Sequence, residues 1–434
     1  MAQFRKDRHE YLPDGKTLFE VVMLADQYGN RIGPANPSGV AVDAFGRARG
    51  SQPFTLFDSF NRYEDNGKFA TANTATSTYS YSANAATTSL TVDTTSGAKV
   101  QRETTRVFAY QPGKSLLIMN SFVMNAAQAN LAQRVGYFND QNGVYLEQTG
   151  STVRFVLKSF TNGSASYNYV EQASWNKDTM LGAVSTSPSQ LTLDLTKAQI
   201  FWCDIEWLGV GSVRCGFVID GMFIHCHTFH HANIIAGTYM TTACLPVRYE
   251  IENTGTTTAS STFKQICTSV ISEGGYELRG DGRTFGQEPT AQRSLSSAGT
   301  YYPVISIRLA PTKNDGIAVP KGITIAPINQ AIYKYKIIMG PTLTGDSWTS
   351  VGADSCVEYD ANNSTTMSGG TVLASGLINA TNQAAASVSL DGDMFKYQLE
   401  RNGLANTSTI FTLAMTCGTA TSNVVATVDW QEFT

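Results

Sequence analysis

The dipeptide Asp220-Gly221 constrains this chain more than any other feature, because it separates two runs of alternating apolar and polar residues, 213–219 and 222–229. Both central positions of a two-residue β-hairpin turn need a positive φ, and Asp-Gly is a preferred pair there. The sequence therefore predicts an antiparallel ribbon with one apolar and one polar face. A two-residue loop also fixes the register that we predict for this ribbon: Phe217 opposite Ile224, Cys215 opposite Cys226, and Arg214 opposite His227.

The preceding segment, 199–207, continues the same alternation, so we expect it to form the next strand of the sheet. A polar sheet face with an aromatic plate and charged groups is typical of a sugar-binding surface. The candidate glycan-binding residues on that face are Trp202, Asp204, Glu206, Arg214 and His227. An alternative interpretation is that Arg214 simply pairs with Asp204 or Glu206 and leaves no binding function.

Many further short strands are indicated along the chain, and the composition agrees with them. Charged residues make up only 15% of the sequence, whereas helices normally carry Glu, Lys and Arg on their surfaces. We predict an all-β protein in which a lectin- or glucanase-like jelly-roll sandwich is followed by a second β-sandwich. The predicted boundaries are an irregular N-terminal docking arm at 1–60, the jelly roll at 61–278, and the second sandwich at 279–434.

Charge and hydropathy exclude several classes of partner. A net charge of −4 gives no basic surface for nucleic acid, and no apolar run approaches 18 residues, so we expect no membrane insertion. Residues 1–10 are charged and lack the apolar stretch of a secretory signal, which predicts synthesis in a cytoplasm. The seven cysteines show no CxxC pair, so we expect reduced thiols.

The segment Asp204-Ile-Glu-Trp resembles the catalytic strand of the jelly-roll endoglucanases, the lichenase and laminarinase relatives, whose pattern is Glu-Ile-Asp-Ile-Glu. The resemblance implies that Glu206 occupies the acid/base position and Asp204 the helper position. Trp202 stands at the nucleophile position, and an indole cannot attack an anomeric carbon. We therefore predict that the chain is not an enzyme and has no catalytic residues, with a polysaccharide hydrolase kept as an alternative.

Four of the five histidines lie within 225–231, and imidazole is a common metal ligand. His225 and His227 are predicted to share a strand face, but no third ligand follows at a fixed spacing. No phosphate-binding or dinucleotide-binding glycine motif is present either. We expect no cofactor and no metal, and metal binding at this histidine cluster stays open as an alternative.

A further resemblance is carried by the stretches 44–59, 103–123, 134–150, 207–233, 245–255 and 429–433. These stretches are similar to virion structural proteins of tailed bacteriophages, chiefly aquatic ones. The resemblance implies a particle component in the tail, baseplate or capsid decoration, located in the virion, with other virion proteins as partners. It brings no catalytic motif with it.

The residues themselves lead to a compatible prediction. All-β folds expose strand edges unless something covers them, and identical neighbours can do so, which favours a homo-oligomer. We therefore predict a structural component of a tailed-phage virion that assembles through its N-terminal arm. The alternative function is a carbohydrate-binding adhesin that recognises a host-surface glycan.

Overall fold

The described residues of the computed structural model are 9–11, 18–20, 52–65, 67–277, 279–381, 386–389 and 397–433. The chain divides into two compact units, residues 1–52 and residues 53–434. In the first unit, β1 (His9–Tyr11) and β2 (Leu18–Glu20) form a short antiparallel hairpin.

Most of the predicted N-terminal arm, 1–60, lies outside the described residues, so the arm stays a prediction. Its last segment, β3 (Phe54–Phe60), belongs to the second unit and pairs with β17 (Ser261–Ser272). The predicted division of the chain at 278/279 also stays a prediction.

The prediction of an all-β fold is confirmed. Regular structure in the described residues consists of antiparallel strands and two single-turn 3-10 helices, η1 (Gln172–Ser174) and η2 (Pro311–Lys313). No helix of the described part of the chain is long and apolar enough to cross a membrane. The predicted turn is also confirmed, because Asp220 and Gly221 have φ values of 51° and 77°.

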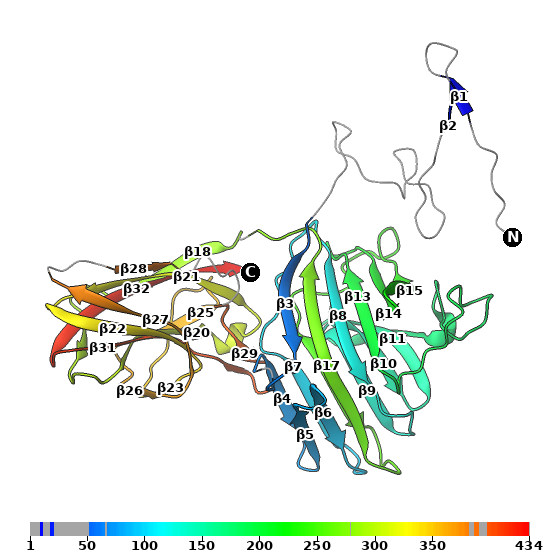
Figure 1. Ribbon diagram of the computed structural model, residues 1–434, viewed down its shortest axis with the longest axis horizontal. Coiled ribbons are helices and arrows are strands. Elements are labelled where there is room, and N and C mark those ends of the chain that lie inside the picture. Colours follow the sequence, from blue (N-terminus) through cyan, green and yellow to red (C-terminus); the bar gives the residue numbers. More distant parts are fainter. Residues whose placement is uncertain are drawn as a thin grey trace. The chain divides into compact units, whose positions relative to one another are not determined.

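A seven-stranded antiparallel sheet forms one layer of the first sandwich (Figure 1). Its strands, in spatial order, are β12 (Ser166–Glu171), β11 (Thr152–Ser159), β10 (Gly143–Thr149), β9 (Leu131–Phe138), β16 (Val247–Asn253), β7 (Lys99–Thr104) and β4 (Phe69–Asn73).

An eight-stranded sheet forms the other layer, with β3 paired to β17 outside the main order. Its remaining strands, in spatial order, are β15 (Met222–Phe229), β14 (Val213–Ile219), β13 (Gln199–Ile205), β8 (Leu116–Val123), β17, β6 (Thr87–Val92) and β5 (Ser77–Ser82).

The core of the first sandwich lies between these two sheets, as the alternation of their residues requires. Phe155 of β11 stacks on Trp175 with ring centroids 4.1 Å apart, and Phe201 and Phe217 from the opposite sheet pack against it. Each strand therefore sends every second side chain inward and the intervening ones to the outer face.

The second sandwich contains a five-stranded and a six-stranded sheet. The five-stranded sheet consists of β18 (Asp281–Gly286), β32 (Ser422–Phe433), β21 (Ile317–Pro327), β28 (Ala386–Ser389) and β19 (Arg293–Leu295). The six-stranded sheet consists of β24 (Thr349–Ser350), β25 (Val357–Ala361), β20 (Tyr302–Leu309), β31 (Phe411–Cys417), β22 (Ala331–Met339) and β27 (Thr371–Ala380). Two further pairs are β23 (Thr342–Thr344) with β26 (Thr366–Ser368) and β29 (Arg401–Asn402) with β30 (Thr407–Ser408).

Polar contacts connect residues near β7 with residues near β29. Arg106 Nη2 and Glu400 form an ion pair at 2.6 Å, and Gln398 Nε2 donates to the carbonyl oxygen of Val107 at 3.0 Å. Arg401 Nη1 donates to Glu103 at 3.3 Å. Glu103 is thereby held from two sides, because it also accepts hydrogen bonds from Arg248 within the first sandwich.

Candidate functional site

The five residues predicted as a glycan-binding face do not form one surface. Asp204, Glu206 and Arg214 line a single pocket, whereas Trp202 and His227 are not part of its lining. Trp202 is 5% exposed, and its Nε1 donates to the carbonyl oxygen of Phe217 at 3.2 Å. A buried indole with its N–H already bonded offers no plate on which a sugar ring can stack.

The pocket that these residues do form is called here the Asp204 pocket, and its volume is about 640 Å³. Asp204 is buried and forms an ion pair with the half-exposed Arg214. Burial raises the pKa of Asp204, although Arg214 opposes this effect. The residues that line the Asp204 pocket include Asp204, Glu206, Arg214, Lys114, Lys177, His225 and Thr228.

His227 is displaced from the predicted face by a β-bulge in the ribbon. The register shifts between Cys215 and Gly216, so that Cys215 lies opposite His227. The partners predicted for Cys215 and Arg214 are therefore wrong. A Cβ at Gly216 would lie 2.9 Å from the ring of Trp202, so only glycine permits this close approach. His227 consequently packs edge-on against Phe229 with ring centroids 4.6 Å apart.

The histidine cluster is engaged in ordinary hydrogen bonds. His225 Nε2 lies 2.8 Å from Thr228 Oγ1, and His231 Nδ1 lies 2.6 Å from the carbonyl oxygen of Gly211. Burial lowers the pKa of both His225 and His227 to about 4. Among the described residues, which include 225–231, no group of three or more His, Cys, Asp or Glu is arranged to hold a metal ion.

A second polar surface, which the sequence analysis did not identify, lies on the outer face of the seven-stranded sheet. Here the register places acceptors and donors alternately across six neighbouring strands. In spatial order, this charged row consists of Gln101, Glu250, Arg134, Glu147, Arg154 and Glu171.

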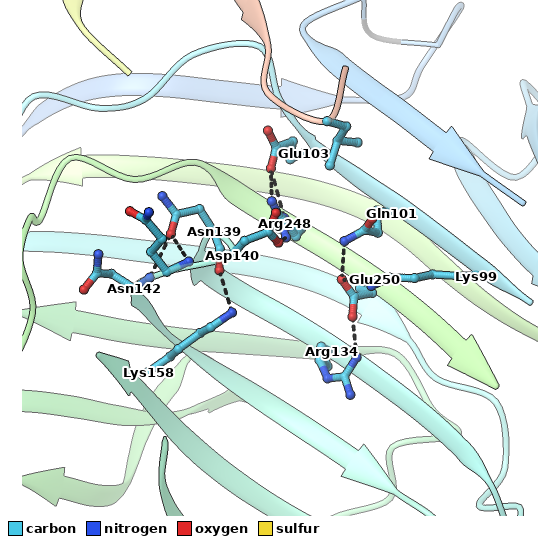
Figure 2. Close-up of polar contacts among 12 residues, drawn as sticks. Lys99, Gln101, Glu103, Arg134, Asn139, Asp140, Asn142, Lys158, Arg248 and Glu250 are labelled. Carbon is cyan, nitrogen blue, oxygen red and sulfur yellow. Dashed lines mark hydrogen bonds and ion pairs between the residues drawn. The ribbon is translucent and has the colours of Figure 1, made fainter. Parts of the chain in front are cut away.

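Arg134 is the centre of the charged row, because it contacts carboxylates on both sides. Its Nε donates to Glu147 at 2.7 Å, and its Nη1 donates to Glu250 (Figure 2). Burial acts to lower the pKa of Arg134, but Glu250 and Glu147 outweigh burial and raise it. Burial likewise acts to raise the pKa of Glu250, but Arg134 and Lys99 outweigh it and keep that carboxyl ionised.

The buried carboxylates of the row are occupied by protein donors. Glu147, with a side chain only 3% exposed, accepts from Nε of Arg134 and Nε of Arg154 on different oxygens. Glu250 accepts from Arg134 on one oxygen and from Gln101 on the other, the latter at 2.7 Å. Such saturation offsets the desolvation penalty that an unpaired buried carboxylate carries.

Two tyrosines of β12 stand at the end of this row. Tyr167 and Tyr169 are about half exposed, and their rings are parallel, with centroids 5.5 Å apart and an interplanar angle of 3°. The guanidinium of Arg154 lies 3.8 Å from the centroid of Tyr169. This stack holds the rings in a fixed orientation without closing them off from solvent.

These elements surround a hollow of about 330 Å³, called here the charged groove. Five cationic and four anionic side chains line it, so its formal balance is one positive charge. The charged groove is lined by Lys99, Arg134, Phe138, Asp140, Tyr145, Glu147, Arg154, Lys158, Tyr167, Tyr169, Arg248, Glu250 and Glu252.

A polar groove with aromatic residues at one end suits a ligand that carries many hydroxyl groups. The sequence contains one local signal for it, the alternation Tyr167-Asn-Tyr169 in a polar segment that was not predicted as a strand. The charged row has no such signal, because its members come from distant segments that only the sheet order brings together.

Comparison with known proteins shows no family for this chain. No protein-family model matches the chain, and no curated protein matches it by sequence. Solved structures do match. Bacillus licheniformis β-glucanase is 11% identical, with a TM-score of 0.33, and the match covers 51% of this chain and 98% of that one. The Emp47p carbohydrate recognition domain is 10% identical, with a TM-score of 0.31 and coverages of 50% and 94%.

A third match is the CBM2 module of the evolved Dit of Lactobacillus casei BL23 phage J-1. It is 5% identical, has a TM-score of 0.34, and covers 53% of this chain and 100% of that module. The matched structures are glucanase-like, lectin-like and carbohydrate-binding domains, in accord with the jelly-roll type of fold. At these identities and TM-scores they say nothing about the ligand or partner of this chain.

One prediction requires correction. The prediction that the chain is not an enzyme is wrong, because a β-glucanase is among the solved structures that match the chain. An architecture that also occurs in enzymes gives no ground for excluding catalysis. The missing nucleophile at Trp202 speaks only against the one endoglucanase arrangement from which the prediction was argued.

Proposed function

We propose that the chain binds a carbohydrate in the charged groove. The observation that carries this proposal is the parallel stack of Tyr167 and Tyr169 beside a polar hollow of about 330 Å³. Sugars combine apolar C–H faces with many hydroxyl groups, so they fit surfaces that pair aromatic rings with fixed hydrogen-bonding groups.

Rigidity of the groove supports the same proposal. Arg154 is fixed at Nε by Glu147 and along its plane by Tyr169, so neither side chain has to be immobilised when a ligand arrives. A preorganised site loses less conformational entropy on binding than a mobile one.

A glycan array followed by titration calorimetry on the full chain tests the proposal. For the glycan that binds, Tyr167→Ala and Tyr169→Ala are each expected to weaken affinity about tenfold or more, as lost aromatic contact predicts. Tyr79→Ala is the matched control, because Tyr79 is 46% exposed, like Tyr169, but lies on β5 of the other sheet. An array with no bound glycan, or an equal loss with Tyr79→Ala, would overturn the proposal.

The Asp204 pocket is the competing location for a glycan, since it holds three of the residues that the sequence analysis selected. Glu206→Gln distinguishes the two locations, because Glu206 is exposed and its substitution leaves the fold intact. Loss of glycan binding in this variant, with Tyr167→Ala unaffected, would move the site to the Asp204 pocket.

A second proposed function is a structural role in a tailed-phage particle, assembled through the N-terminal arm as a homo-oligomer. What supports it is the resemblance of six separate stretches of the sequence, between residues 44 and 433, to virion structural proteins. Deleting residues 1–50 is expected to leave a folded protein that no longer joins particles. Normal incorporation of this truncated chain, measured by mass spectrometry of purified particles, would contradict the arm's role.

A further inference from the structure

The charged groove offers its ligand more hydrogen-bond donors than acceptors. The buried acceptors are already in use, because both oxygens of Glu147 and both oxygens of Glu250 accept from protein donors. Glu103, beside the groove, is occupied in the same way by Arg248 and Arg401. Acceptors that stay open lie at the rim, on the exposed Asp140 and the half-buried Glu252.

The donors are only partly used. Within the described part of the chain, Arg134 Nη2 and both Nη atoms of Arg154 have no hydrogen-bond partner, and the Arg154 side chain is 22% exposed. Lys158 Nζ donates to the carbonyl oxygen of Asn139 at 3.2 Å (Figure 2) and forms no ion pair with a described carboxylate. The ligand therefore meets guanidinium and ammonium groups that still have hydrogens to donate.

The free edge of Arg154 has a shape that selects among ligands. Since Glu147 takes the Nε hydrogen, the two Nη groups remain as a planar fork, and Tyr169 fixes the plane of that fork. A planar fork of two N–H groups matches the two oxygens of a carboxylate and forms two parallel charge-assisted hydrogen bonds.

From this arrangement we propose that the glycan of the charged groove is acidic, and that the carboxylate of a uronic-acid-type sugar binds to the Nη edge of Arg154. Lys158 supplies additional positive charge on the same wall, where it faces Tyr167 at 5.5 Å from the ring centroid. This inference rests on the proposed function, because it specifies the ligand of that same groove.

The test compares one oligosaccharide in two forms. Oligogalacturonate, oligoglucuronate and mixed alginate oligosaccharides are titrated against the full chain, alongside the same oligosaccharides after chemical reduction of their carboxyl groups. At least one acidic form is expected to bind about tenfold or more tightly than its reduced form, as two charge-assisted hydrogen bonds predict, and its affinity falls as salt rises. This comparison uses the unaltered protein and does not depend on any variant folding.

Arg154→Lys refines the test, because lysine keeps the positive charge next to Glu147 but has no planar fork. The variant is expected to lose most of the preference for the acidic form, measured as the ratio of the affinities for the acidic and reduced forms. Arg279→Lys is the matched control, since Arg279 is largely exposed and forms its ion pair with Glu277, which is also exposed.

The outcomes separate the two proposals. Equal or tighter binding of the reduced oligosaccharides would overturn the acidic ligand and leave carbohydrate binding in place. An acidic preference that is unchanged in Arg154→Lys would also overturn the assignment to Arg154. Binding of neither form, together with an empty glycan array, would overturn carbohydrate binding itself.

Discussion

The two outer faces of the first sandwich differ in how completely their buried carboxylates are paired with donors. On the seven-stranded sheet, charged groups alternate across five strands, and both Glu147 and Glu250 have donors on both carboxylate oxygens. On the eight-stranded sheet, Asp204 has one partner among the described residues, Arg214, and its second oxygen is buried with no partner from this part of the chain. The neighbouring histidines have pKa values of about 4 and are therefore neutral at pH 7.

The comparison shows what strand register can and cannot arrange. A regular antiparallel ladder sets complementary side chains directly across from one another, so the members of the charged row from Gln101 to Arg154 meet their partners without distortion. The bulge in the ribbon of β14 and β15 breaks such a ladder, and there Arg214 and His227 no longer face each other. Four measurements would sharpen or break this contrast.

The largest effect is expected at Glu147. Glu147→Ala removes the shared acceptor of Arg134 and Arg154, and we expect the free energy of unfolding to fall by about 3 kcal/mol, as for other broken buried ion pairs. Urea unfolding measures this loss. Glu277→Ala, which removes the exposed partner of Arg279, is the control, and a loss no larger than that of the control would contradict a stabilising row.

Arg214→Ala should have the next largest effect, and its size should depend on pH. The buried Asp204 loses its partner, which we expect to cost about 2 kcal/mol at pH 7. Because the folded-state pKa of Asp204 is raised, protonation favours the folded chain as the pH falls through that value. The difference from the unaltered protein should therefore shrink at low pH. A difference that stays constant or grows at low pH would count against this explanation.

The histidines should make the chain less stable in mild acid. The unfolded chain binds protons near the ordinary histidine pKa, whereas folded His225 and His227 bind them only near pH 4. Their contribution to stability is complete above the ordinary pKa and is lost as the pH falls through that window. Each should lose roughly 1 kcal/mol over the first pH unit below 6.5. His227→Gln should flatten this slope by about half in urea unfolding at several pH values, and an unchanged slope would be inconsistent with the shift.

The smallest effect is expected at the rim of the charged groove. Glu252→Gln keeps the shape of a half-buried residue that contacts Arg134 and Lys99, and we expect a loss of at most about 0.5 kcal/mol. Urea unfolding beside Glu147→Ala gives the ratio of the two losses. If the two losses were equal, the distinction between buried and rim carboxylates would fail.

Local features of the molecule could be predicted from the sequence, and long-range ones could not. Asp220-Gly221 determines its turn through its own backbone preferences, and the alternation in 199–205 places Phe201, Cys203 and Ile205 in the core. At the bulge, Gly216 lies against the Trp202 ring and the Ile224 carbonyl oxygen, contacts from other strands that no local pattern encodes.

The candidate site illustrates the same limit. Arg134 meets Glu250 only because β9 pairs with β16, which lies more than a hundred residues further along the chain. The strand β12 was missed because Val170 is its only half-buried side chain and the other five are exposed, so it lacks the apolar alternation that marks a half-buried strand.

The position of Arg134 between two strands has a consequence for how this surface can diverge. Any replacement at 134 leaves both Glu147 and Glu250 short of a partner, so it requires coordinated changes on β10 and β16. Replacing Tyr167 requires no such coordinated change, because it accepts no hydrogen bond or ion pair from the charged row. We expect descendants of this chain to acquire new ligands through single replacements at the β11–β12 end, while the middle of the sheet stays the same.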